Sequence, residues 1–156
     1  MCKKCWLVVS LLLLIIAGAG YKFMVAGDTK SSADGRLAIQ LNPSERDLVL
    51  AEMRSFLSSI QQISSGISEA DFKLISEQAR LSGGAAQQGV PASLMGKLPM
   101  AFKKLGFDTH QKFDLLAMDA EQLQDKEHTL KQMSTLMNNC VACHAAYQIE
   151  TIKTRQ

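Results

Sequence analysis

The chain has 156 residues, 47% of them hydrophobic, and 17 Lys and Arg against 15 Asp and Glu. Three of the basic residues, Lys3, Lys4 and Lys22, belong to an apolar N-terminal region, so 14 basic residues face 15 acidic ones elsewhere. This balance offers no basic surface for nucleic acid. The sequence also lacks a phosphate-cradling glycine motif, a nucleophile with a partnered base and a spaced carboxylate pair. We therefore do not expect an enzyme.

Residues 1–26 carry the features of a signal anchor. The stretch 6–19 is almost wholly apolar and follows Lys3 and Lys4, which indicates export with the positive end retained inside. Continued to Ala26 it is long enough to cross a bilayer of about 30 Å. We expect a single-pass helix in a bacterial inner membrane, with the remaining chain in the periplasm. The alternative is cleavage near Ala19, which leaves a soluble periplasmic protein.

Two segments flank this anchor. Cys2 and Cys5 precede the apolar run, and we leave both thiols unassigned. Residues 27–41 begin as a small, polar, turn-rich stretch, so we expect a tether. Near its end Leu37, Ile39 and Leu41 alternate with other residues, which favours a short extended stretch, too short to define a sheet.

Residues 42–156 have helical patterning and length for one small core. Asn42, Pro43 and Glu45 form a start signal for a helix that we expect to end near residues 65–66. Ser68 with Asp71 predicts the start of a second helix, which closes over residues 81–84.

A short helical turn over 92–97 precedes a third long helix, which carries an irregularity at Gly106, and Asp125 caps the fourth. Helices joined by short connections favour an antiparallel bundle. The fold class is therefore all-α: a four-helix bundle preceded by a transmembrane helix.

The most specific motif is Cys140-Val-Ala-Cys143-His144. Two thiols at this spacing can each add to a haem vinyl group, and the adjacent histidine then becomes an axial iron ligand. A structural zinc site needs a second ligand pair at similar spacing, which Cys2 and Cys5 do not provide. A thioredoxin-like redox pair follows a strand, and none is predicted before Cys140. Haem attachment is favoured over both.

Periodicity places this motif on a helix. Apolar and motif residues recur at spacings of 3, 4, 3, 4 and 3, in the order Leu130, Met133, Met137, Cys140, His144 and Tyr147. Such spacing gives one helical stripe. We therefore expect both thiols and the histidine to leave the last helix on one side, with the haem buried where that helix packs.

With the motif on the last of four helices, residues 41–156 resemble the cytochrome c′ family. The C-terminal position of the stretch Asn139 to Tyr147 is the specific element. The resemblance implies one covalent haem c held by Cys140 and Cys143, with His144 as proximal ligand. Family members often form homodimers, but most are soluble, so the membrane anchor is a departure. The sequence identifies no redox partner.

In the family, the residue on the distal side of the iron decides function. Met53 lies in the inward stripe of the first helix and is our candidate sixth ligand, which implies an electron carrier. Core packing is the competing interpretation of Met53. Leu50 is the alternative distal residue and implies five-coordinate iron that binds NO or CO.

Other side chains compete more weakly for a place near the haem. Met100 and Met118 are further distal candidates, and His110 is another, although we favour a hydrogen-bonded surface or boundary position for it. Arg46 and Arg54 suit haem propionates, but a solvated helix face is the favoured interpretation.

Overall fold

A computed structural model describes residues 3–152. Cys2 lies outside this range, and the side chain of Cys5 is not described although its backbone is. In chain order the elements are α1 (Lys3–Gly20), the π-helix η1 (Tyr21–Ala26), β1 (Thr29–Ser31), β2 (Leu37–Leu41), α2 (Pro43–Glu69), α3 (Phe72–Leu81), the 3₁₀-helix η2 (Gly84–Gln87), α4 (Ala92–Lys97), α5 (Met100–Leu123), α6 (Lys126–Ala146) and β3 (Tyr147–Thr151). The described chain is mostly helical, as predicted, with a small sheet added.

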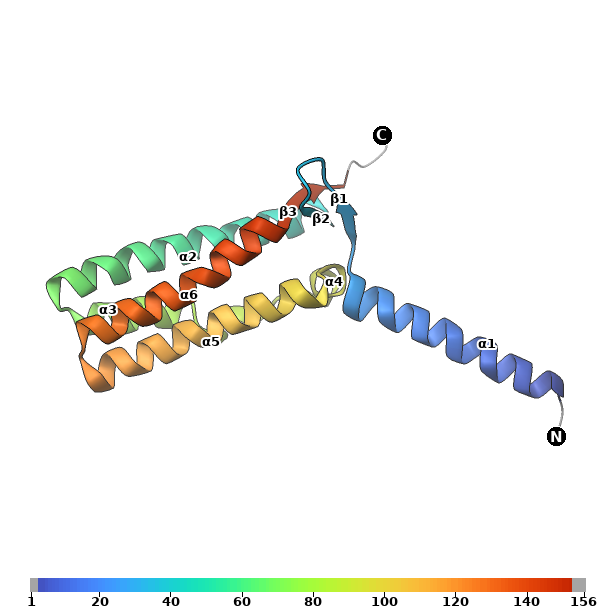
Figure 1. The fold of residues 1–156 in the computed structure, drawn as a ribbon, viewed down its shortest axis with the longest axis horizontal. Coiled ribbons are helices and arrows are strands. Elements are labelled where there is room, and N and C mark those ends of the chain that lie inside the picture. The colour runs from blue at the N-terminus through green and yellow to red at the C-terminus, as the bar shows by residue number, and fades with distance from the viewer. Residues whose placement is uncertain (1–2, 153–156) are drawn as a thin grey trace.

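The N-terminal apolar helix stands apart from the rest of the molecule. α1 projects away from the packed helices, and η1 joins it to the first strand (Figure 1). The 21 residues from Trp6 to Ala26 are unburied, and by length and composition they suffice to cross a membrane or to serve as a signal sequence. The apolar run thus forms one continuous helical segment.

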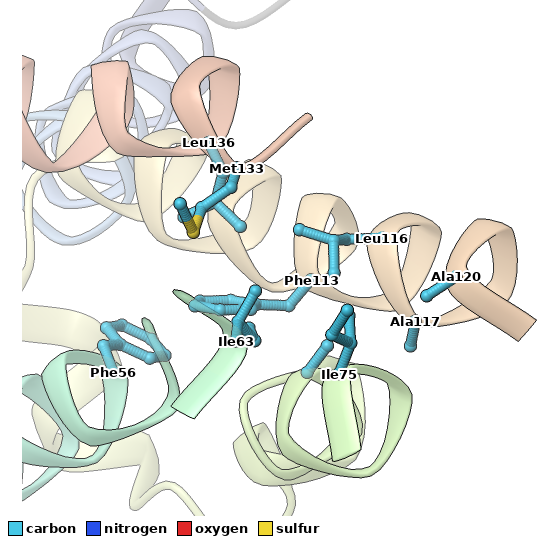
Figure 2. Close-up of a cluster of buried hydrophobic side chains, with 10 residues drawn as sticks. Phe56, Ile63, Ile75, Phe113, Leu116, Ala117, Ala120, Met133 and Leu136 are labelled. Atoms are coloured by element: carbon cyan, nitrogen blue, oxygen red, sulfur yellow. The ribbon is translucent and has the colours of Figure 1, made fainter. Parts of the chain in front are cut away.

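Four helices pack around the main core. α2 packs against α3 and α6, while α5 packs against α3 and α6. Buried side chains from all four fill the space between them, as the cluster around Phe113, Ile63 and Ile75 shows (Figure 2). Burial of large apolar side chains such as these is the main term that stabilises the arrangement.

The predicted capping signal at Asn42 is confirmed, but the predicted end of that helix is wrong. The Asn42 side chain accepts a hydrogen bond from the Glu45 N–H, and the Glu45 carboxylate accepts one from the Asn42 N–H. α2 then runs past Gly66 to Glu69. A Cβ at Gly66 would lie 2.7 Å from Cγ1 of Ile75. That glycine therefore permits the close approach of α3 and does not end the helix.

The predicted starts of the next three helices agree better with the structure. Asp71 caps α3 by accepting from the Leu74 N–H, whereas Ser68 lies inside α2. α4 and α5 follow Pro91 and Pro99 as predicted. α5 is continuous through Gly106, so the expected irregularity there is wrong.

A three-stranded sheet closes one end of the bundle. β1 pairs antiparallel with β2, and β2 pairs parallel with β3, in the order β1-β2-β3. The expectation that residues 37–41 are too short to define a sheet is wrong, because β3 supplies a partner from the other end of the chain. Ala38, Ile39 and Leu41 are almost fully buried. Half of the expected tether is therefore part of the folded domain.

A second core cluster lies beneath this sheet. It joins β2, α2 and α4 through Ile39, Leu41, Val49, Leu94 and Leu98. α3 has only ten residues, so it lines α2 and α5 near one end of the bundle only. The segment 82–99 and the sheet complete the other end, where α6 terminates (Figure 1).

Candidate functional site on α6

α6 positions the cysteine motif at its C-terminal end. Asp125 caps the helix by accepting hydrogen bonds from the N–H groups of Glu127 and His128, at 2.9 and 3.0 Å. This confirms the predicted cap. At the other end the backbone becomes extended at Tyr147, whose N–H donates to the Cys143 carbonyl. The motif thus occupies the last two turns, next to the sheet.

The inward face of α6 differs from the predicted stripe. Met133 and Leu136 are buried, and Cys140 packs against the main core cluster. Met137, by contrast, is 40% exposed. The buried face of α6 therefore overlaps the predicted stripe only in part: it includes Leu136, which the stripe omitted, and leaves out Met137.

Both thiols of the motif are free and half-buried. Burial raises the pKa of the Cys140 thiol, and burial together with the neighbouring Cys140 raises the pKa of Cys143 to about 11. Redox-active cysteines have the opposite property, a lowered pKa that makes the thiolate available at neutral pH. The environment of this pair therefore favours the neutral thiol form of both residues at neutral pH.

His144 is exposed, contrary to the expected burial of the ligand beneath a packed helix. Its backbone carbonyl faces Arg36 at 3.5 Å. Within residues 3–152 no group of three or more His, Cys, Asp and Glu side chains is arranged to hold a metal ion. A single imidazole beside two thiols matches the protein donors that a covalently attached haem requires.

Met53 is half-buried and packs against both core clusters, so it lies at the junction between the two halves of the interior. The helices α2 and α6 run antiparallel (Figure 1), and the Ser64 hydroxyl contacts Sδ of Met133 at 3.6 Å. Met53 is 11 residues before Ser64, and His144 is 11 residues after Met133. At about 1.5 Å per residue, Met53 and His144 lie at the same height along the bundle.

Position along the bundle and exposure distinguish Met53 from the other distal candidates. Leu50, also half-buried, is level with Tyr147, one turn beyond His144. Met118 is 40% exposed on α5. Arg46 pairs with its neighbour Asp47 at the surface, in agreement with a solvated face, and Arg54 is exposed.

A cavity of about 530 Å³ lies between α2 and α5, roofed by α4 and the segment 81–90. Phe56 and Phe102 are among its lining residues, and no residue of α6 is. One of its lining residues, Phe102, makes an edge-to-face contact with Tyr147, the first residue of β3, and the ring centroids are 5.4 Å apart. Sequence patterning did not reveal this cavity, because it arises where the short α3 stops.

His110 lines this cavity and is only 3% exposed, so the predicted surface or boundary position is wrong. Its hydrogen bonds are nevertheless satisfied, as expected. Nδ1 lies 2.8 Å from the Ser82 carbonyl and therefore donates, and Nε2 lies 3.4 Å from Oε1 of Glu52. Burial alone lowers the pKa of His110, but the Glu52 carboxylate and the carbonyl oxygens outweigh it and raise the pKa above 6.5.

Comparison with known proteins adds no relative. No protein family, no curated protein and no solved structure matches the chain.

Proposed function

We propose that the chain is a membrane-anchored, periplasm-facing monohaem c-type cytochrome that transfers single electrons. The observation that carries the proposal is the pair of free, half-buried thiols one turn apart, followed directly by His144. Cys140 and Cys143 would hold the haem through thioether bonds, and His144 would bind the iron on the proximal side. The haem, when bound, supplies one-electron redox chemistry.

The packing of α2, α3, α5 and α6 supports the finer fold assignment, a four-helix bundle like that of the cytochrome c′ family. The surroundings of the thiols are apolar on the core side, because Cys140 packs against the main cluster. An apolar shell excludes water from a haem and raises its reduction potential.

Covalent attachment is tested by haem staining of the full chain after denaturing electrophoresis. The wild type should stain, and the double variant Cys140→Ala/Cys143→Ala should not. The double variant Cys2→Ala/Cys5→Ala carries the same chemical change outside the motif and should stain like the wild type. A wild-type chain without attached haem, expressed with a functioning haem-attachment system, would contradict the proposal in favour of thiol or metal chemistry.

We assign Met53 as the distal ligand, supported by its equal height with His144 across the α2–α6 pair. A thioether sulfur favours ferrous iron and gives a six-coordinate electron carrier. Ferrous wild-type protein should then bind CO slowly, and Met53→Ala should bind it rapidly. Met118→Ala, a methionine on the exposed side of α5, is the matched control. Rapid CO binding by the wild type, unchanged in Met53→Ala, would indicate the five-coordinate NO- or CO-binding alternative.

A further inference from the structure

The N-terminal hairpin reaches the C-terminal end of α6 through Arg36. This residue directly precedes β2, in the tight turn that joins β1 to β2. Asp34 holds the side chain in place: Nε of Arg36 donates to Oδ2 of Asp34 at 2.7 Å, and the Arg36 N–H donates to Oδ1 at 3.1 Å. These hydrogen bonds from Arg36 lower the pKa of Asp34 to about 2. The pair therefore stays charged throughout the neutral range.

Nη2 of Arg36 also pairs with Oδ2 of Asp34, at 2.6 Å, and both Nη1 and Nη2 face the end of α6 and the strand that follows it. Nη1 lies 3.5 Å from the carbonyl oxygen of His144 and 3.4 Å from that of Tyr147. Nη2 donates to Oε1 of Gln148 at 2.8 Å. The last carbonyls of a helix have no partner within the helix, and they attract a cation. Arg36 meets this need at the residue that carries the imidazole.

The strands fix the same segment from one side. β2 pairs in parallel with β3 over its full length, starting with Leu37 opposite Tyr147. The Ile152 N–H also donates to the Leu41 carbonyl at 2.8 Å. Because β2 is buried in the second core cluster, it provides a rigid support for the chain that leaves the motif.

We propose that Arg36 is a positioning residue for His144: it holds the backbone at the proximal ligand and thereby sets the orientation of the imidazole at the iron. This inference rests on the proposed haem site. Groups that orient an axial ligand tune the metal that the ligand binds, although they do not touch it. The segment between the membrane anchor and the bundle is thus part of the proximal side of the site.

The test compares Arg36→Gln with Arg46→Gln, an arginine whose ion pair among residues 3–152 is with its neighbour Asp47. Two quantities are measured on the full chain: amide hydrogen exchange at residues 145–149, and the midpoint potential of the attached haem. Arg36→Gln should accelerate exchange about tenfold, as expected for the loss of hydrogen bonds to a charged group, and should shift the potential. Arg46→Gln should change neither quantity. Arg36→Lys keeps the positive charge but loses the planar guanidinium with its several donors. Its exchange rate and midpoint potential should therefore lie between those of Arg36→Gln and the wild type.

The outcomes separate this inference from the proposed function. All variants should keep their covalent haem, because the thiols are untouched. A wild-type chain without haem contradicts the proposed function. With haem attached, an Arg36→Gln potential equal to that of the wild type overturns the positioning role, even if exchange is faster. Unchanged exchange overturns the structural contact itself.

Discussion

At the scale of single residues, two buried ionisable side chains, Glu45 and His110, have specific partners. Glu45 is 6% exposed and accepts from Nζ of Lys97 at 2.6 Å as well as from the Asn42 N–H. Burial opposes the charge on Glu45, but these hydrogen bonds outweigh it and lower its pKa. His110 is matched in the same way, to two carbonyls and to Glu52. Each pair ties α2 to a more distant segment.

His110 makes stability depend on pH. Its pKa in the folded protein is above 6.5, so its charged form stabilises the fold fully below pH 6.5, and that contribution is lost as pH rises through the folded pKa. We expect His110→Gln to remove this dependence. The measurement is urea unfolding of the full chain in detergent at pH 6 and pH 8.5, followed by circular dichroism. Equal pH slopes for wild type and variant would contradict the assignment.

At the scale of elements, two glycines lie inside helices, and packing requires only one of them to be glycine. A Cβ at Gly106 meets no atom within 4 Å, and α5 is regular there, so nothing in the structure requires this glycine. A Cβ at Gly66 meets Ile75 at 2.7 Å, because α3 packs directly on it. The sequence placed Gly66 at a helix end and Gly106 at an irregularity within a helix, but both lie inside continuous helices and differ in their neighbours.

The same substitution should therefore have opposite effects at the two sites. Gly106→Ala should raise the free energy of unfolding by about 0.5–1 kcal/mol, since alanine loses less backbone entropy in a helix. Gly66→Ala should lower it by about 1–3 kcal/mol through overpacking against α3. Chemical denaturation of the two variants beside the wild type measures both changes. A loss of stability in both would mean that Gly106 has a role in α5 beyond its backbone.

At the scale of the whole molecule, the apolar N-terminal helix is joined to the domain by packed backbone. Gly27 has φ +65°, and a Cβ there would lie 2.5 Å from the Lys97 carbonyl oxygen. The Asp28 N–H donates to that oxygen at 2.7 Å. The chain thus passes from η1 to β1 in contact with the end of α4, so the orientation of the domain relative to α1 is set by close contacts.

Gly27→Ala should disturb this junction. Gly35→Ala is the matched control, because Gly35 also has positive φ (+85°) but open space around its Cβ position. We expect Gly35→Ala to cost about 1 kcal/mol of unfolding free energy through backbone strain. Gly27→Ala should cost about 1–3 kcal/mol more through its clash, and limited proteolysis should cleave faster near residue 27. Equal losses of unfolding free energy in Gly27→Ala and Gly35→Ala would contradict a packed junction at Gly27.

Much of the local structure followed from the sequence. Asn42, Asp125 and the two prolines before α4 and α5 marked helix starts correctly, because caps and proline act through the nearest few backbone groups. The cysteine motif was placed on the last helix for a similar reason, since its spacing is itself helical. Gly66 was misread because glycine marks a helix end and a close helix contact alike.

What the sequence determined by itself was the apolar N-terminal helix, the main helices and the grouping of Cys140, Cys143 and His144, all of which depend on residues close together in the chain. Tertiary structure decided the pairing of β2 with β3, the burial of His110 and the contact of Arg36 with the end of α6. These join segments up to 110 residues apart. No local pattern encodes them, because they depend on which surfaces remain free once the helices have packed.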